Sequence, residues 1–500
     1  MDGCQINDNW RLKRMAKELT LDEALKFSLK FAEKKGATEF EAYAVSSREI
    51  SIGLEKSIPQ TTTGISEGLS IRVVANKNIG FAFTKTLTKA RLESTIKAAL
   101  QNARSKGPDP DYHSLPQPAS PPPVKFTFDE ELLTVTADSL ADGLEHVIKK
   151  INAVKSLKFL QGQLSLTVIK DHLINSNGVD ISSQGGGIGG FTAAITTKGL
   201  IPNYSYGIHG SPTLKGFNYD ILAQETIKQT LRAAGPKTMN FNKEVPIILE
   251  PEASFGLLGG LFSLLFTQLQ GNNVDRGATP YSDQVGNQIA VENFTLIDNG
   301  LNTEKINRSL FDAEGTPQQK TVLIEKGVLQ TYLLDSYYGH KLGLESNGKS
   351  TRMGIFGFGG DPVKTYPSIS QTVPEVAPGD SSKEEMFAET KEGFLLRSLM
   401  GMHMSDSSSG RFSVTGFGWY IKNGEIQYPV QGINISGFLP ELLKNIDLIS
   451  KEREALLLAD SPYIRFALVP VTAKKFDFKT RFGLTLLKII SVLTGKHPMI

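Results

Sequence analysis

The chain has 500 residues, which is too long for a single hydrophobic core and predicts two or three domains. With 40% hydrophobic and 21% charged residues it has the composition of a globular protein, and its net charge of +2 argues against a dedicated nucleic-acid binder. The one cysteine, Cys4, excludes an internal disulfide and a multi-cysteine zinc site and fits a reducing compartment. The first residues lack the apolar core of a signal peptide, so we expect a cytoplasmic location.

The first half of the chain predicts an α+β domain over residues 20–238, preceded by an N-terminal extension, 1–19. Apolar residues at helical spacing, with a capping box at Thr20–Glu23 before the first run, predict helices that begin at residue 21 and span 92–103, 140–151 and 220–234. Period-two runs predict antiparallel strands at 41–45, 50–54, 68–74, 79–83, 159–169, 180–183 and 191–197. Seven prolines in 107–124 predict a linker or a long surface loop.

The second half predicts a strand-rich domain over residues 239–473. It opens with a short buried strand, 246–249, that turns directly into an apolar helix reaching Phe266, with Pro251 at the first helical position. Further predictions are hairpins 321–324/328–334 and 418–421/425–428, a helix from about Pro440 to Ile449 and a closing strand, 463–471. A glycine-rich segment, 354–383, is expected to be mobile. The basic amphipathic tail, 474–500, is expected to dock on its own domain or on a partner rather than on a membrane.

Three glycine motifs match known patterns by letter but lack the required context. Gly185–Gly190 satisfies G-x-G-x-x-G but leads into a strand, where a dinucleotide site needs a helix N-terminus. Gly343–Ser350 satisfies the P-loop pattern but follows a predicted helix and precedes a glycine-rich run. Gly64–Gly68 has the letters of a nucleophile elbow, yet a strand follows Ser66 instead of a helix. We interpret all three as turns or loops.

The seven histidines lie too far apart in the sequence to form an H-x-x-H or H-E-x-x-H pair, so no single helix can present two imidazoles to a metal. His403, in a loop rich in methionine and serine, is the one histidine that we single out as a candidate functional residue.

The segment Ser309–Gly343, with its run Phe311-Asp-Ala-Glu-Gly-Thr-Pro317, resembles the TldD/PmbA family, also called the modulator of DNA gyrase family. Supporting matches are Gly68–Val73, Asn175–Gly178, Gly418–Val430 and Leu443–Ile446, and the resemblance extends over residues 20–473. It implies a two-domain α+β architecture, with an N-terminal α/β sandwich on an antiparallel sheet and a strand-rich C-terminal domain. It also implies a role in TldD–TldE heterodimeric metalloproteases that act on peptides.

In the TldD type, the resemblance places the zinc motif H-E-x-x-x-H on Pro251–Gly256 of this chain. Pro251 and Gly256 stand at the two ligand positions, and Glu252 stands where the general base would be. The region around Ala459–Pro462, where a third ligand is expected, has no cysteine. The resemblance therefore implies a TldE/PmbA-type subunit without its own metal, paired with a TldD-like subunit that carries the zinc.

Peptide-contact candidates in this reading are the loop-borne Asp312 and Glu314, and His403; the alternative for each is maintenance of the fold. Three other functions remain open at this stage. They are an independent metallopeptidase with dispersed ligands, an ATP-binding regulator that uses Gly343–Ser350, and a stand-alone homodimeric scaffold.

Overall fold

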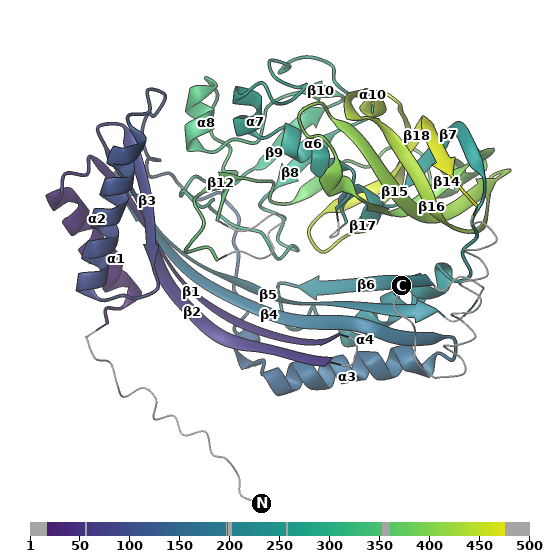
Figure 1. The fold of residues 1–500 in the computed structure, drawn as a ribbon, viewed down its shortest axis with the longest axis horizontal. Helices are drawn as coiled ribbons and strands as arrows, with labels where there is room; N and C mark the ends of the chain where they lie inside the picture. Colours follow the sequence, from purple (N-terminus) through teal and green to yellow (C-terminus); the bar gives the residue numbers. More distant parts are fainter. Residues whose placement is uncertain are drawn as a thin grey trace, which may run out of the picture.

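The structure, a computed structural model, describes residues 18–55, 58–196, 198, 203–256, 259–352 and 361–475. These residues form a long curved sheet, sheet A, and a strand-rich unit built on a second sheet, sheet B (Figure 1). The mixed α+β class predicted from the sequence is confirmed. The predictions for residues 1–17, for 353–360 in the glycine-rich segment and for 476–500 in the basic tail lie outside the described residues.

Sheet A has six strands in the order β3-β2-β1-β4-β5-β6, and every neighbouring pair is antiparallel. Its strands are β1 (Glu39–Glu55), β2 (Ile58–Ala75), β3 (Asn78–Thr84), β4 (Leu157–Asn175), β5 (Asp180–Thr196) and β6 (Asn203–Ser211). The predicted hairpin turn between β2 and β3 is confirmed. Asn76 and Lys77 both adopt positive φ angles, 51° and 63°, as a two-residue turn of the primed type requires.

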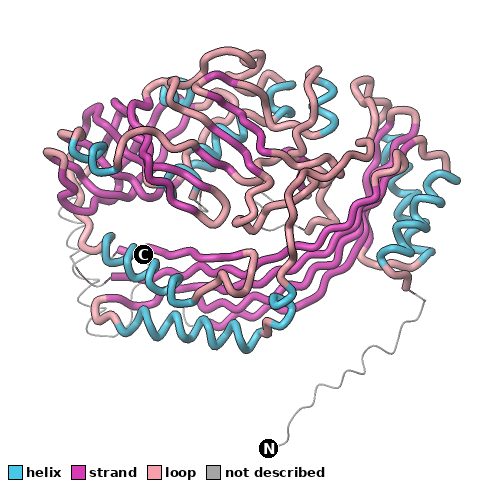
Figure 2. Tube along the Cα trace, turned by 180° about the vertical axis from the view of Figure 1, so that it is seen from behind, coloured by secondary structure: helices cyan, strands magenta, loops and turns pink. Residues whose placement is uncertain are grey.

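Four helices cover one face of sheet A, and the strand-rich unit lies over the other face (Figures 1 and 2). They are α1 (Leu21–Lys34), α2 (Lys89–Lys106), α3 (Ala137–Ala153) and α4 (Tyr219–Arg232). All four were predicted, and the capping box at the start of α1 is formed by Thr20 and Glu23. Side chains of β1 alternate between the two faces: Phe40 and Ala42 pack in the α1–α2 core, whereas Tyr43 and Val45 pack on the other side.

Sheet B has ten strands, all from the second half of the chain. Five of them close into a ring. The ring runs β7-β14-β15-β16-β18 and back to β7, because β18 pairs with both β16 and β7. Its members are β7 (Phe241–Leu249), β14 (Glu392–Met400), β15 (Arg411–Lys422), β16 (Glu425–Phe438) and β18 (Asp460–Ala473). The remaining strands are β8 (Leu296–Asn299), β9 (Lys320–Glu325), β10 (Val328–Leu329), β13 (Pro374–Val376) and β17 (Ile446–Ala455).

Short elements complete the C-terminal unit around one large apolar core. They are α5 (Pro251–Phe255), α6 (Phe262–Gln268), α7 (Gly271–Asp275), α8 (Ser336–Lys341), α9 (Lys383–Ala388), α10 (Leu439–Leu443), the 3-10 turn Met402–Met404, and the two-stranded pair β11 (Ser350–Thr351) and β12 (Ser368–Ile369). A second 3-10 turn, Glu130–Thr134, belongs to the N-terminal unit, where Leu132 packs in the core of sheet A with α3 and α4. The predicted β15–β16 hairpin is confirmed, with Asn423 and Gly424 at φ angles of 53° and 81°.

Three predicted elements of the second half are shorter than expected. The apolar helix after Pro251 is divided into α5 and α6, because Gly256 is extended with a ψ of 153° and Gly259 has a φ of 106°. The helix at Pro440 ends at Leu443, and 446–455 is β17, held by pairing with β18. The strand expected at 328–334 ends at Leu329. In each case a tertiary contact or a glycine overrides the local apolar pattern.

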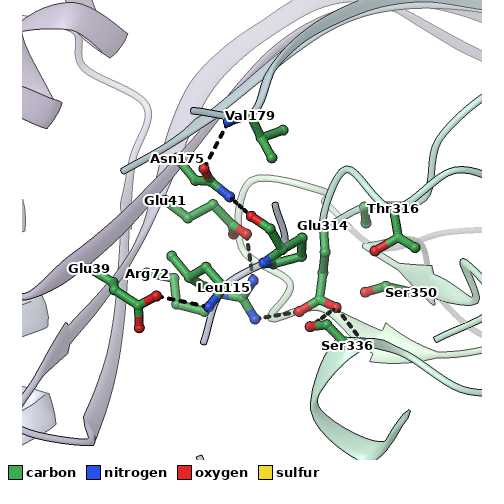
Figure 3. Close-up of polar contacts among 12 residues, drawn as sticks. Glu39, Glu41, Arg72, Leu115, Asn175, Val179, Glu314, Thr316, Ser336 and Ser350 are labelled. Carbon is green, nitrogen blue, oxygen red and sulfur yellow. Dashed lines mark hydrogen bonds and ion pairs between the residues drawn. The ribbon is translucent and has the colours of Figure 1, made fainter. Parts of the chain in front are cut away.

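The proline-rich segment 107–124 is a surface loop that is bound to sheet A. The Glu39 carboxylate accepts hydrogen bonds from the Tyr112 hydroxyl and the Ser114 hydroxyl. It also accepts one from the backbone N–H of Leu115 (Figure 3). This loop therefore belongs to the N-terminal unit. Among the helices of the described residues, none is both long and apolar enough to cross a membrane.

Candidate functional site

The segment that resembles a zinc-binding motif begins where β7 ends. Pro251 occupies the start of α5, as predicted, and Glu250 precedes it with its backbone N–H bonded to the carbonyl of Leu396. The buried Glu250 carboxylate does not cap α5. Its Oε1 lies 2.6 Å from Nη2 of Arg232 and its Oε2 lies 3.2 Å from Nη1 of Arg397, so it is bound by two arginines.

Glu252, at the general-base position, also has protein partners. Its Oε1 accepts a hydrogen bond of 3.0 Å from the hydroxyl of Tyr206, which comes from β6 of sheet A. Burial in the first place, and then the charge of Glu252, raises the pKa of Tyr206, so this phenol stays protonated and keeps donating. The carboxylate of Glu252 therefore links the C-terminal unit to sheet A through Tyr206 and is not positioned as a general base.

The position of Gly256 cannot accept a side chain in this conformation. A Cβ atom there would lie 2.3 Å from the backbone oxygen of Glu252 and 2.7 Å from its Oε1. The carboxylate of Glu252 therefore occupies the space into which a ligand at 256 would project. Glycine is required here by the close approach of the helix end to its own first turn.

A small pocket, open to solvent, lies beside this helix end. Its wall is uncharged and comes from α5, α6, the 371–374 segment and the loop before β18: Phe255, Gly256, Gly260, Ser263, Phe266, Asn307, Gln371, Thr372, Pro374, Leu458 and Ala459. Ala459 is at the place where the third zinc ligand was expected. Within the described ranges, no group of three or more His, Cys, Asp or Glu side chains could hold a metal ion. The residues present at this pocket do not fit zinc.

A second cluster lies where sheet A meets the C-terminal unit, and we call it the interdomain ion network: Glu41, Arg72, Glu314 and Arg352, all buried. Figure 3 shows Arg72 between Glu41 and Glu314. Arg72 bridges the two units, with Nη2 2.5 Å from Oε2 of Glu41 and Nη1 2.5 Å from Oε1 of Glu314. Arg352 binds the other oxygen of Glu41 at 2.5 Å. Strand alternation explains the arrangement, since Glu41 and Arg72 are on the face of sheet A opposite its helices.

The peptide-contact candidates Asp312 and Glu314 are both buried in this region. Glu314 Oε2 accepts bonds from the backbone N–H and the hydroxyl of Ser336, in addition to the contact of Oε1 with Arg72. Asp312 accepts backbone N–H bonds from Glu314, Thr316 and Ser350. Each carboxylate oxygen therefore has a protein donor, which favours the alternative that these two residues maintain the fold; a peptide contact remains a prediction.

The carboxyl groups next to the network make stability depend on pH. Burial, together with the charge of Glu314, raises the pKa of Asp335 to about 7. A carboxyl whose pKa is raised on folding adds stability that is complete below its ordinary pKa and is lost as pH rises through the folded value. We therefore expect the free energy of unfolding to fall as pH rises from about 4 to about 7.

Asp335→Asn is expected to flatten this pH dependence, because asparagine keeps the acceptor for the N–H of Tyr338 but does not titrate. Urea unfolding of both proteins at a series of pH values measures the effect. Parallel curves for the two proteins would contradict the assignment to Asp335.

The P-loop pattern does not form a phosphate site. Lys349 is fully buried, with Nζ 2.8 Å from Oδ2 of Asp298 and 3.2 Å from Oε1 of Gln318. The segment runs from α8 to the two-residue strand β11, so it lacks the strand before it and the helix after it. Lys349, the lysine that would reach the phosphates, is instead buried in an ion pair with Asp298. This contact argues against the ATP-binding alternative.

The interpretation of the other two glycine motifs as turns or loops is wrong. Gly185–Gly190 is within the continuous strand β5, and Gly64–Gly68 is within β2, where the Ser66 hydroxyl accepts a bond from Lys85. His403 is exposed in the 3-10 turn Met402–Met404, and its role stays a prediction.

Sequence reasoning missed the network and the two arginines at Glu250. The available signal was a charged residue inside an apolar strand, Arg72 in Gly68-Leu-Ser-Ile-Arg-Val73 and Glu250 after Ile247-Ile-Leu249. Such charges are seldom buried without partners. The partners themselves come from distant parts of the chain and were not identifiable from the sequence.

Gly256→Ala is expected to lower the free energy of unfolding by about 1–3 kcal/mol, because the new methyl group would overlap the backbone of Glu252. Gly185→Ala is the matched control, since a Cβ there meets no atom within 4 Å. Urea unfolding measures both variants. Equal stabilities would show that the end of α5 can move aside.

Two models of known protein families match the sequence of this chain. The model for the PmbA/TldA metallopeptidase C-terminal domain matches residues 242–473, and the model for domain 1 matches residues 40–103. These two matches define the class of the chain as metallopeptidase-like. The chain belongs to the PmbA/TldD family.

Individual relatives extend over nearly the whole chain. A protein of Methanocaldococcus jannaschii is 28% identical over 87% of this chain and 96% of its own length. The metalloprotease PmbA homolog of Haemophilus influenzae is 25% identical over 88% of this chain and 93% of its own length. The crystal structure of TldE from Thermococcus kodakarensis superimposes with a TM-score of 0.78 at 25% identity, covering 90% of this chain and all of that one.

Proposed function

We propose that this chain is the metal-free, TldE/PmbA-like subunit of a heterodimeric metalloprotease of the TldD–TldE type. Its partner is a TldD-like chain that carries H-E-x-x-x-H and the zinc, and the complex processes peptides and unfolded segments. The single observation that carries the proposal is that the segment Pro251–Gly256, which corresponds to the zinc motif, has no side chain able to bind the metal at its two ligand positions. Pro251 and Gly256 offer no side-chain ligand, and Glu252 fills the space at Gly256 and binds Tyr206.

In this role the chain completes a substrate channel over the zinc of the partner. Strand addition at an exposed sheet edge is a way to hold an extended peptide without reading its sequence. A cytoplasmic location is part of the same proposal. Because a carboxylate without a metal-bound water has nothing to activate in this type of hydrolysis, Glu252 has no catalytic role here.

The test is purification of the chain from its native cell, followed by identification of bound proteins and metal analysis. We expect a one-to-one complex with a chain that bears H-E-x-x-x-H, with zinc in the partner after the two are separated. Tightly bound zinc in this chain alone would overturn the proposal and favour an independent metallopeptidase. A homodimer without such a partner would favour a scaffold.

A further inference from the structure

A small pocket lies where the proline-rich loop of the N-terminal unit meets the C-terminal unit, and we call it the interdomain pocket. Its wall combines β2 and β3 of sheet A, the loop segment 112–115, the start of α8 and Tyr366. It shares no lining residue with the pocket beside α5. The polar side chains of the wall include Arg72, Tyr112, Ser114, Ser336, Tyr337 and Tyr366.

The proline-rich loop holds this pocket between the two units. One side of the loop binds the carboxylate of Glu39 on sheet A. On the other side, Asp109 accepts a hydrogen bond of 2.9 Å from the hydroxyl of Tyr337 in α8, and the ring of His113 stacks on that of His340 with centroids 4.0 Å apart. The wall of the pocket is therefore made of side chains that are positioned by contacts with both units.

Arg72 supplies the pocket with a hydrogen-bond donor that has no acceptor. Its two terminal nitrogens are bound to Glu41 and Glu314, whereas its Nε has no hydrogen-bond partner among the described residues (Figure 3). Arg72 is only 6% exposed, so this N–H group is withheld from bulk water. An unsatisfied buried donor costs free energy, which an acceptor that enters the pocket would recover.

The hydroxyl groups of the wall are mostly restricted to the role of acceptor. Four of them already give their protons to carboxylates: Tyr112 and Ser114 to Glu39, Ser336 to Glu314, and Tyr337 to Asp109. A hydroxyl whose proton is already donated can offer a ligand only its lone pairs. The pocket therefore presents several acceptor oxygens to a ligand in addition to the N–H of Arg72.

Tyr366 is the one hydroxyl of the wall that can act as a second donor. It gives its proton to no carboxylate in the described part of the chain, and a phenol is protonated at neutral pH. Its ring centroid lies 5.9 Å from Cζ of Arg72, and the two side chains interact electrostatically. A ligand oxygen in the pocket can therefore accept from the Nε–H of Arg72 and from the hydroxyl of Tyr366 together.

These groups select a ligand by its charge. The acceptor oxygens and the neighbouring carboxylate of Glu39 disfavour an anion, and the guanidinium of Arg72 disfavours a cation. The interdomain ion network behind the pocket contains two arginines and two glutamates, so it adds no net charge. A planar amide matches this wall, because its carbonyl oxygen can accept from the two donors while its N–H group donates to the hydroxyl oxygens.

We infer that the interdomain pocket is a binding site for an amide group, which an asparagine or glutamine side chain or a peptide bond can supply. Because the wall comes from both units, a bound amide would also link them. The inference is independent of the proposed function, since it requires neither a partner subunit nor zinc.

Three planar probes of nearly equal shape test the charge preference on the full chain at neutral pH: acetamide, acetate and acetamidinium. Saturation-transfer NMR observed on the probe measures each Kd. Acetamide is expected to bind with a Kd on the order of millimolar, and the two charged probes at least about tenfold more weakly. N-acetylglutamine methylamide and N-acetylalanine methylamide then distinguish the two sources, since tighter binding of the first assigns the side-chain amide and equal binding assigns the peptide bond.

Tyr366→Phe removes one of the two donors and is expected to raise the Kd of acetamide at least about fivefold. Because Tyr366 is 42% exposed, the variant is expected to unfold in urea like the wild type. The matched control is Tyr204→Phe, which removes the hydroxyl of an exposed tyrosine in β6 and should leave the Kd unchanged.

Two results would overturn the inference. Acetate or acetamidinium binding as tightly as acetamide would show that the pocket does not select a neutral amide. No saturable binding of any probe, or acetamide binding that Tyr366→Phe leaves unchanged, would show that the pocket holds water only.

Discussion

Arg72→Met is expected to lower the free energy of unfolding by about 3–5 kcal/mol. Arg72 compensates two buried carboxylates at once, Glu41 and Glu314, with both contacts at 2.5 Å. Removing one partner of a buried ion pair leaves a charge in a medium that cannot solvate it. Because Glu41 is in sheet A and Glu314 is in the C-terminal unit, the loss should also loosen the two units. Urea unfolding measures the stability, and small-angle X-ray scattering measures any increase in the radius of gyration.

Two further variants test whether the cost comes from the uncompensated charge. Arg72→Met combined with Glu314→Gln should be less destabilised than the sum of the two single variants, since fewer buried charges remain unpaired. Lys97→Met removes an exposed i,i+4 pair with Glu93 at 3.9 Å and should change stability by no more than about 0.5 kcal/mol. A cost for Arg72→Met as small as that of Lys97→Met would refute the role of the network.

Lys349→Met is expected to cost a similar amount, about 3–5 kcal/mol, and to leave nucleotide binding unchanged. Its Nζ contacts the Asp298 carboxylate at 2.8 Å, and neither side chain is exposed. Asp298 also accepts backbone N–H bonds from Thr372 and Val373 through Oδ1, so the ion pair anchors the segment before β13. Methionine approximates the length of the lysine stem but leaves the carboxylate without its cation. Urea unfolding and equilibrium titration with ATP are the two measurements.

The control for this variant is Lys149→Met, which removes an exposed pair with Glu145 and is expected to change stability by at most about 0.5 kcal/mol. Tight ATP binding by the wild-type chain that disappears in Lys349→Met would restore the phosphate-site interpretation. Full stability of Lys349→Met would show that the Asp298 carboxylate is satisfied by the two backbone groups alone.

Most elements of the N-terminal unit could be predicted because their signals are local. The capping box of α1, the apolar faces of α2 to α4 and the turn at Asn76 and Lys77 each depend on a few neighbouring residues. The same is true of the Asn423–Gly424 turn. Elements of the C-terminal unit were predicted less well, because β17 and the division between α5 and α6 depend on partners far away in the sequence.

The sequence by itself determined what the zinc-motif segment cannot do. Pro251 and Gly256 have no side-chain lone pair, whatever the fold around them. It also determined the class of the fold, because the apolar periodicities that distinguish helices from strands can be read from neighbouring residues. Only the tertiary structure decided what replaces the missing site. It brought Tyr206 of β6 to Glu252, two arginines to Glu250, and Arg72 between Glu41 and Glu314. Such contacts join residues up to hundreds of positions apart, and no local pattern of side chains specifies which buried charge finds which partner.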